Sequence, residues 1–393
     1  MRDSGQPPET EPSARLEVTL LYGIFAATGI GMALPGAVLP ALMRQWALRD
    51  SGAGLLLFLA WMGSSTGALA AGRHRRAVVS TGCAAVALSL TSIAFGPASL
   101  RFAGMVLYGL GLGGAMTATS LMQAARHPRD CAREMNRLNM IWAVGAVSCP
   151  SLAAHSLRVA SVRYICATLA ATFLLLSAML ALTALRSPHP LPAPLAVTPL
   201  QKRIGNPLLL WPIPLLLLAF LPTGIESTMG GWVAEYARRE HRSIATAVLA
   251  GSLFWGGVLT SRALGATRFL RWRTERGLLL QSAWTILFGV LLLVVLPDRT
   301  GILFGNALVG FGLGPVYPLA LALALRHREH PSIFWIAGLG SASLPWLTGL
   351  ASTATGSLRL GLLVPLAATL LLLCSGLLAR TDLPAAVQET RRL

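Results

Sequence analysis

The chain has 393 residues, of which 54% are hydrophobic and only 12% are charged. A soluble domain carries roughly 25% charged residues, so this chain has too few polar side chains to cover a surface that faces water. The composition excludes an ordinary soluble protein, and the net charge of +17 must be explained in some other context.

Long apolar runs decide the fold class. A run of about 20 apolar residues is long enough to cross a hydrocarbon core of about 30 Å as a helix. Such runs are centred near residues 30, 62, 86, 111, 145, 173, 221, 254, 286, 312, 342 and 368. Runs such as Leu366–Leu373 do not alternate in polarity, which argues against a β-barrel. We therefore predict an all-α membrane protein with twelve transmembrane helices.

Polar and proline-rich segments divide the chain. Residues 1–17 are polar and precede an apolar run longer than that of a signal peptide, so they are predicted to be a disordered tail. Residues 187–206 are rich in proline, which helix interiors exclude, and are predicted to be a linker. The linker separates two predicted six-helix bundles, residues 18–186 and 207–380. Residues 381–393 form a second predicted tail.

The basic residues sort by loop. With twelve spans, most of the 32 Lys and Arg residues fall on the side that carries both termini. An excess of basic residues in short loops marks the cytoplasmic face. We therefore expect a multi-pass protein of the plasma (inner) membrane with both termini in the cytoplasm. The basic charge is interpreted as a topology signal and a contact with anionic lipids, not as a nucleic-acid site.

Three glycine-containing segments of the first bundle recur in the second, in the same order and at similar spacing. Trp61-Met62-Gly63 matches Trp255-Gly256-Gly257, the segment Gly109–Gly113 matches Gly310–Gly314, and Gly145–Pro150 matches Gly340–Pro345. Two parallel six-helix repeats are typical of the major facilitator superfamily.

Loop motifs also resemble those of this superfamily. The segment from Gly67 through Gly72 and Arg73 to Arg76 resembles its glycine–arginine loop motif, although the usual acidic residue is absent. The segment that ends at Arg262 resembles the copy of this motif in the second half. The resemblance covers nearly the whole chain and implies two pseudo-symmetric bundles.

A narrower resemblance points to the fucose/glucose permease branch. Gly224–Tyr236 is similar to helix seven of that branch, which carries Gly-x-Glu, then Gly-Gly-Trp and a Tyr. Asn136–Pro150 is similar to its helix five, and Gly312–Pro318 to its helix ten. The proton-driven members place acids in helices one and four, whereas neither corresponding helix predicted here contains one. Their proton relay therefore does not transfer to this chain.

Glu226 is the one carboxylate inside a predicted span. A charged group at the centre of a membrane costs about 2.5–3.5 kcal/mol on insertion scales, so such groups usually face a cavity or a partner. We expect Glu226 to bind substrate, to carry a coupling proton, or both. The alternative is a structural pair with a basic or hydroxyl group on a neighbouring helix.

Aromatic and polar side chains supply further candidates, each with a structural alternative. The tryptophans could stack on a sugar ring or simply pack and anchor helices. The polar stripe Thr117, Thr119, Ser120 and Gln123 could line a cavity or bond back to its own helix. Asn139, close to Asn136, could reach the cavity or bond between helices. The candidate binding or coupling residues are Glu226, Trp232, Gln123, Asn139, Trp61, Trp142, Tyr317 and Thr119. The candidate gating or loop-motif residues are Gly67, Gly72, Arg73, Arg262, Glu235 and Tyr236.

The predicted function is secondary transport of a small polar solute, a neutral sugar or polyol, either coupled to protons through Glu226 or by facilitated uptake. Two alternatives stay open: proton-driven efflux of amphipathic metabolites, and a membrane sensor that does not transport. No phosphate-binding loop, zinc pattern or Ser/His/Asp set indicates an enzyme, and the five cysteines lack metal-ligand spacing. We expect no cofactor and no metal. The expected partners are the solute, protons and lipids, and the expected state is a monomer.

Overall fold

The computed structural model describes residues 12–72, 74–127, 130–159, 161–186, 212–241, 243–265, 274–327 and 332–378. The predicted linker 187–206, the tail 381–393 and Arg73 lie outside these ranges. The first bundle contains α1 (Pro12–Trp46), α2 (Asp50–Leu69), η2 (Ala70–Gly72), α3 (Arg75–Phe95), η3 (Ala98–Leu100), α4 (Arg101–Arg126), α5 (Cys131–Val159) and α6 (Val162–Arg186). The second contains α7 (Ile213–His241), α8 (Ile244–Gly265), α9 (Glu275–Val295), α10 (Arg299–His327), α11 (Ser332–Thr355), α12 (Leu358–Gly361) and α13 (Leu363–Leu378).

The described residues contain 12 helical segments that are long and apolar enough to cross a membrane. Each predicted centre falls within one of them, so the predicted all-α fold with twelve spans is confirmed. The last span, Leu358–Leu378, is built from α12 and α13 together. Helix α1 begins at Pro12, ahead of the predicted boundary at residue 18, so part of the expected N-terminal tail is helical.

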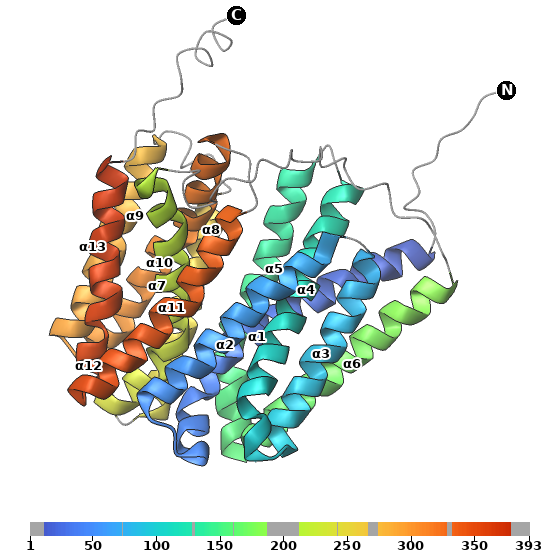
Figure 1. Ribbon diagram of the computed structural model, residues 1–393, viewed down its shortest axis with the longest axis horizontal. Helices are drawn as coiled ribbons and strands as arrows, with labels where there is room; N and C mark the ends of the chain where they lie inside the picture. The colour runs from blue at the N-terminus through green and yellow to red at the C-terminus, as the bar shows by residue number, and fades with distance from the viewer. Residues whose placement is uncertain are drawn as a thin grey trace, which may run out of the picture.

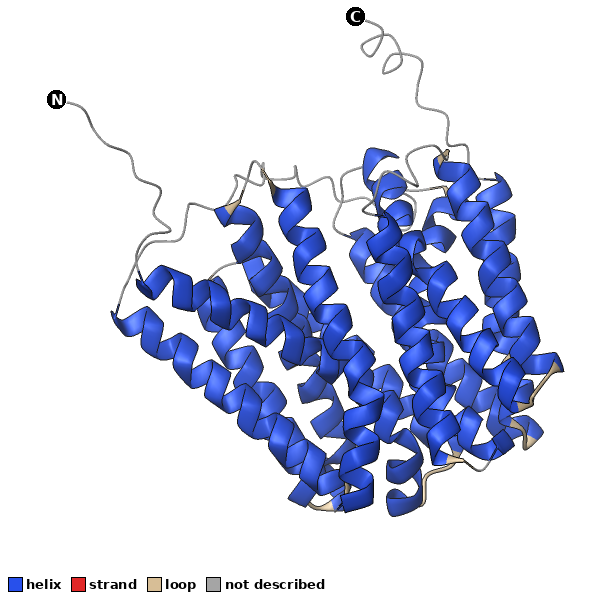
Figure 2. Cartoon of the chain, turned by 180° about the vertical axis from the view of Figure 1, so that it is seen from behind, coloured by secondary structure: helices blue, strands red, loops and turns tan. Residues whose placement is uncertain are grey.

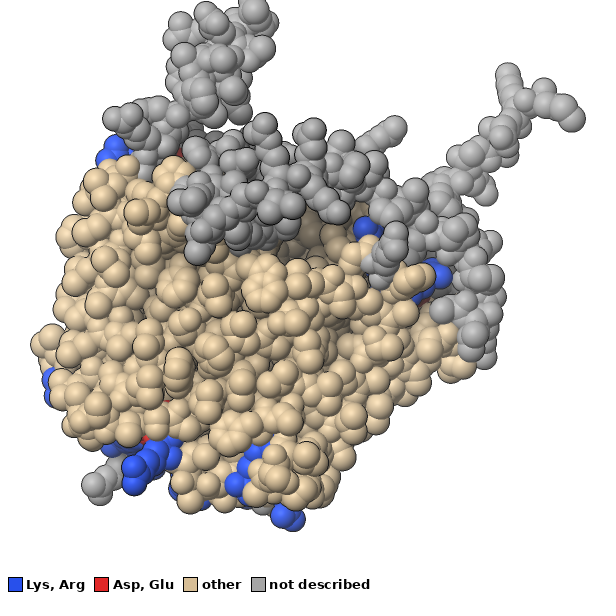
Figure 3. Space-filling view, viewed as in Figure 1, with Lys and Arg blue, Asp and Glu red and all other residues tan. Residues whose placement is uncertain are grey.

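The two bundles stand side by side (Figures 1 and 2). Helix α1 begins and α13 ends at the same end of the molecule, which we call the terminal face (Figure 1). The other end is the opposite face. In the view of Figure 3, Lys and Arg gather toward these two ends and leave a broad uncharged band between them. This distribution is what a hydrocarbon core requires of the surface that it surrounds.

The repeated glycines make equivalent contacts in the two bundles. A Cβ atom on Gly63 of α2 would overlap the carbonyl oxygen of Val106 on α4, and one on Gly257 of α8 would overlap that of Ala307 on α10. Small residues allow membrane helices to approach this closely. The α2–α4 pair of the first bundle is therefore matched by the α8–α10 pair of the second.

The third repeat shows the same correspondence. Gly145 of α5 lies against the carbonyl oxygen of Ala26 on α1, and Gly340 of α11 lies against that of Phe220 on α7. Between the bundles, α2 packs against α11, α5 against α8 and α1 against α7. The sequence repeats thus correspond to repeated helix packing. At the interface, α1 meets its equivalent α7, and the α2–α11 and α5–α8 contacts are equivalent to each other.

Two adjacent glycines allow a test of this packing. We expect Gly257→Ala to destabilise the protein by about 1–3 kcal/mol, because the added methyl group must displace the α10 backbone. The neighbouring substitution Gly256→Ala is the matched control, since a Cβ there meets nothing within 4 Å. Thermal unfolding in detergent should show a melting temperature several degrees lower for Gly257→Ala only. Equal melting temperatures for the two variants would contradict the packing argument.

Candidate functional site

The candidate site is centred on Glu226 in α7. This residue lies about 20 Å along the helix from Ile213, at the depth of the membrane interior. Its carboxylate oxygen Oε2 is 3.6 Å from Nη2 of Arg262 on α8. The two side chains are 19% and 16% exposed, so both are largely shielded. Arg262, which we assigned to a loop motif, is therefore the basic partner of Glu226.

The Glu226–Arg262 pair is a loose one. A charge-assisted N–H···O hydrogen bond is about 2.7–2.9 Å long, so 3.6 Å is an ion pair without a hydrogen bond. The Nε of Arg262 instead points toward the carbonyl oxygen of Gly314 on α10 at 3.4 Å. The oxygens of Glu226 consequently remain available to accept hydrogen bonds from a bound molecule.

Arg262 also connects Glu226 to the first bundle. Its guanidinium carbon lies 5.7 Å from the ring centroid of Trp142 on α5. That distance falls within the range of a cation–π contact. The ring of Trp142 meets the ring of Trp255 on α8 edge-on, with centroids 5.6 Å apart. The site is therefore built by both bundles, with Trp142 from one and Glu226, Arg262 and Trp255 from the other.

Two more candidates flank this group. Tyr317 on α10 is within electrostatic range of Glu226 and Arg262. Asn139 is exposed and lies three residues before Trp142, on the same side of α5 and one turn nearer the terminal face. The indole N–H of Trp142 is buried and has no hydrogen-bond partner among the described residues. These groups add possible donors and acceptors around the Glu226–Arg262 pair.

Other polar candidates lie in the first bundle. The indole N–H of Trp61, the hydroxyl of Thr119 and the amide of Gln123 are buried without a hydrogen-bond partner in the described part of the chain. Ser120 bonds to the carbonyl oxygen of Met116 on its own helix, at 2.9 Å. The polar residues of α4 therefore differ in role. Ser120 bonds back to its own helix, whereas the amide of Gln123 has no partner among the described residues.

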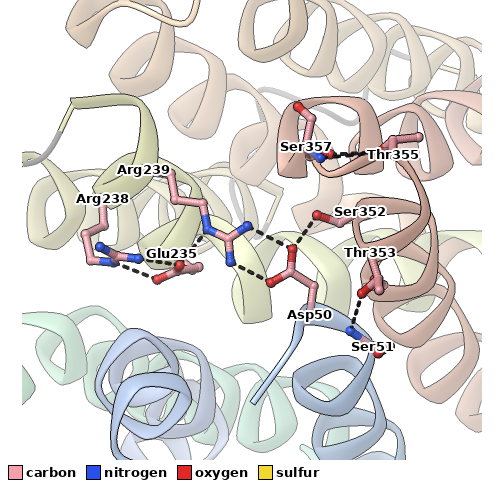
Figure 4. A network of polar contacts seen from close by, with 10 residues as sticks. Asp50, Ser51, Glu235, Arg238, Arg239, Ser352, Thr353, Thr355 and Ser357 are labelled. Carbon is pink, nitrogen blue, oxygen red and sulfur yellow. Dashed lines mark hydrogen bonds and ion pairs between the residues drawn. The ribbon is translucent and has the colours of Figure 1, made fainter. Parts of the chain in front are cut away.

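Glu235 belongs to a separate ion network at the opposite face (Figure 4). Its carboxylate accepts hydrogen bonds from Arg238 at 2.6 and 2.8 Å and from Arg239 at 2.6 Å. Arg239 also donates to Asp50 of α2 at 2.5 and 2.8 Å, and Ser352 of α11 donates to Asp50 at 2.5 Å. These five residues form what we call the opposite-face network.

The opposite-face network joins the two bundles. Asp50 belongs to the first bundle and Arg239 to the second, and their side chains are 11% and 30% exposed. Beside them, the backbone N–H of Ser51 donates to Thr353 of α11 at 2.8 Å (Figure 4). Glu235 is only 1% exposed, so its ion pairs with the two arginines are shielded from solvent. The hydrogen bonds of the network are 2.5–2.8 Å long, whereas Glu226 and Arg262 are 3.6 Å apart. Contacts this short between the bundles are what a closed end of the molecule requires.

Two aromatic candidates on α7 occupy packing positions. The indole N–H of Trp232 donates to the carbonyl oxygen of Pro345 on α11 at 3.0 Å, and the side chain is fully buried. The hydroxyl of Tyr236 donates to the carbonyl oxygen of Leu293 on α9. Both hydrogen bonds tie α7 to helices of its own bundle, so we do not include Trp232 or Tyr236 in the site.

The loop-motif residues lie at the terminal face. Gly67 packs against the carbonyl oxygen of Leu110 on α4, whereas Gly72 has open space around it. The acid that the motif lacks is replaced by Glu17 of α1, which pairs with Arg76 at 2.6 Å and with Arg126 at 2.8 Å. We expected no acid in the first transmembrane helix, and the buried Glu17 corrects that expectation.

Sequence reasoning missed Asp50, Glu17 and Glu134. Asp50 starts a helix, which is a common place for an acid, so its sequence position gave no sign of a partner 189 residues away. Glu134 is buried near the start of α5 and accepts a hydrogen bond from Tyr22 of α1. All three lie near the ends of helices, where hydropathy does not separate buried acids from solvated ones.

Comparisons with known proteins identify the family and the fold to which this chain is similar. A sequence profile of the Major Facilitator Superfamily matches residues 20–333. No curated protein matches the sequence significantly. The crystal structure of a D-xylose–proton symporter superposes with a TM-score of 0.66 at 14% identity, covering 91% of this chain and 97% of that one.

Two further solved structures are similar. A mutant of the nucleoside transporter NupG gives a TM-score of 0.70 at 12% identity, covering 92% of this chain and 99% of that one. A bacterial homologue of the human lysosomal transporter Spinster, in an inward-facing and occupied conformation, gives 0.67 at 13% identity, with coverages of 94% and 96%. At these identities the likeness establishes the fold alone.

Proposed function

Because the chain belongs to the major facilitator superfamily, we propose that it is a secondary transporter for a small, hydroxyl-rich neutral solute, a sugar or polyol. The solute crosses the inner membrane by alternating access, with both termini of the protein in the cytoplasm. The observation that carries this proposal is the loose Glu226–Arg262 pair, which lies in the membrane interior against Trp142 of the other bundle. When the bundles rock against each other, a site that both of them build becomes exposed to one side of the membrane and then to the other.

The chemistry of the site suits a neutral solute with hydroxyl groups. Glu226 accepts hydrogen bonds, Arg262 and the indole N–H of Trp142 donate them, and the tryptophan rings offer apolar faces to the C–H side of a sugar ring. Glu226 and Arg262 already balance each other's charge, so a neutral solute leaves no net charge in the membrane. An anionic or cationic solute would upset that balance.

Glu226 is also the proposed coupling residue. When it takes up a proton, the ion pair is lost and Arg262 is left with its Gly314 and Trp142 contacts. Proton and solute then enter the same site, which links their movement. The named functions of two structural neighbours, a D-xylose–proton symporter and a nucleoside transporter, support a solute that contains a sugar ring.

The opposite-face network is proposed to close the outer end of the solute path. Its Asp50–Arg239 hydrogen bonds of 2.5 and 2.8 Å join the bundles, which supports a conformation closed at this end. Rocking toward the outward-open state requires the separation of Asp50 from Arg239. The Glu226 site would then exchange with the other side of the membrane.

Uptake by purified protein in liposomes tests this function directly. We expect saturable uptake of at least one member of a panel of neutral sugars and polyols, with a faster initial rate when the outside is more acidic. Liposomes without protein provide the baseline. The absence of uptake for every sugar and polyol, with or without a pH gradient, would overturn the proposal.

A further inference from the structure

A pocket of about 210 Å³ lies between the bundles, in the part of the molecule near the opposite face. It is lined by α1, α5, α7 and α8. Apart from three arginines, its wall consists of Ala, Pro, Gly, Val, Leu, Ile and Trp residues, and neither Asp nor Glu lines it. Trp255 forms part of this wall and also meets Trp142, so it separates the pocket from the Glu226 site.

The three arginines share one level of the molecule. Arg44 is in the last turn of α1 and Arg158 is in the last turn of α5. Arg238 lies near the end of α7, where Glu235 accepts two of its hydrogen bonds. Arg44 and Arg158 are exposed. The rim of the pocket thus carries two exposed arginines and a third that is already paired.

The apolar wall extends from this rim toward the middle of the membrane. Along α1 the lining runs from Arg44 back to Ala33, which is about 16 Å of helix. Along α7 it runs from Arg238 back to Gly230, which is about 12 Å. The arginines therefore lie at the depth of lipid headgroups, and the apolar wall lies at the depth of acyl chains.

We propose that this pocket binds an anionic phospholipid from the membrane leaflet at the opposite face. The lipid phosphate contacts Arg44 and Arg158, because a guanidinium group binds phosphate oxygens through two parallel hydrogen bonds. Part of an acyl chain lies against Ala37, Ala154 and Val248. A free phosphate ion would gain nothing from the apolar wall, and a choline headgroup would bring a cation beside the arginines.

The proposed lipid also links the two bundles. Arg44 and Arg158 belong to the first bundle, whereas Arg238, Val248 and Trp255 belong to the second. A lipid that fills the pocket contacts both and would be released when they separate at this face. Bound lipid therefore stabilises the state closed by the opposite-face network, independently of the solute that the Glu226 site carries.

Lipid binding can be measured on the purified full chain in detergent. Dioleoylphosphatidylglycerol, dioleoylphosphatidylcholine and sodium phosphate are titrated separately, with native mass spectrometry for bound lipid and thermal unfolding for stability. We expect the phosphatidylglycerol to bind about tenfold more tightly than the phosphatidylcholine and to raise the melting temperature. Sodium phosphate should neither raise the melting temperature nor displace the lipid.

Paired variants locate the site. The double variant Arg44→Gln with Arg158→Gln should weaken phosphatidylglycerol binding about tenfold or more. The control, Arg163→Gln with Arg299→Gln, removes two exposed arginines near the same face that do not line the pocket, and should bind as the wild type does. Ala154→Phe, which fills the pocket without changing charge, should also weaken binding and covers the case in which the double variant misfolds.

Three results would overturn the proposal. The first is equal binding of the two phospholipids, which would remove the role of the anionic headgroup. The second is an equal loss of binding in the pocket variants and the control, which would indicate a general surface-charge effect. The third is competition by sodium phosphate, which would indicate an anion site that does not use the apolar wall.

Discussion

Glu226→Gln is expected to lower the initial rate of proton-driven uptake about 100-fold or more. Glutamine keeps the size of the side chain but removes its charge and its ability to carry a proton. Removal of one partner from a buried ion pair costs about 3–5 kcal/mol when the other charge stays buried. We use the lower end of this range, about 3 kcal/mol, since both side chains keep some exposure and the pair is loose. At 1.4 kcal/mol per tenfold change, this is more than a 100-fold effect.

Side-by-side flux in liposomes measures this effect. Glu240→Gln is the matched control, because Glu240 is an exposed acid on the same helix that lies outside the site. We expect the control to transport at the wild-type rate. A Glu226→Gln variant that kept proton-driven accumulation would show that Glu226 does not couple the two movements.

Breaking the Asp50–Arg239 contact is expected to open the face that it closes. The pair is mostly buried and makes two hydrogen bonds of 2.5 and 2.8 Å, so its removal should destabilise the closed state by about 2–3 kcal/mol. A change of that size shifts a two-state population by more than tenfold. Either Asp50→Asn or Arg239→Gln should therefore favour the state that is open at the opposite face.

Chemical labelling can report this opening. Ala53→Cys, in a background without the native cysteines, places a thiol at a fully buried position one turn from Asp50. Its reaction with a membrane-impermeant maleimide should accelerate about tenfold or more in either gate variant. Arg163→Gln, an exposed arginine of α6 outside the network, should leave the labelling rate unchanged.

An exchange of charges provides a further check on the same contact. Combining Asp50→Arg with Arg239→Asp should slow maleimide labelling of the thiol at position 53 again, because the opposite charges once more face each other. Restoration is incomplete because an arginine at the start of α2 opposes the helix dipole. Fast labelling in the exchanged variant, equal to that in the single variants, would contradict an electrostatic closing contact.

The fold could be predicted because its signals are local. Each span needs its own run of apolar residues, and the repeated glycines are required wherever equivalent helices meet closely. Thus Gly63 and Gly257 indicated the relation between the bundles before any contact was known. The start of α1 was misplaced because a run of apolar residues does not include the charged turn that holds Glu17.

The site could be predicted only in part. Glu226 stood out because a carboxylate inside an apolar run is rare, but its partner Arg262 was assigned to a loop motif because it lies near the end of α8. Trp232 was a candidate because its ring could stack on a sugar, and it lies six residues after Glu226. Six residues turn about 240° around a helix, so Trp232 points away toward α11.

The contacts between bundles could not be predicted at all. Asp50 and Arg239 are charged residues near helix ends, where charged residues are common. The sequence pattern within one bundle does not determine how that bundle packs against the other. The same holds for Trp142 and Arg262, whose contact crosses the interface. Such pairs follow from how two rigid bundles dock, which sequence patterns within each bundle do not specify.

The central claim is that one site inside the membrane faces the two sides in turn. Counterflow tests it most directly: liposomes loaded with an unlabelled solute from the uptake panel are diluted into a trace of the labelled solute. A carrier with alternating access predicts a transient accumulation of label above its equilibrium level, without any pH gradient. Label that rises only to equilibrium, as through a channel, or no entry at all, as for a sensor, would contradict the account.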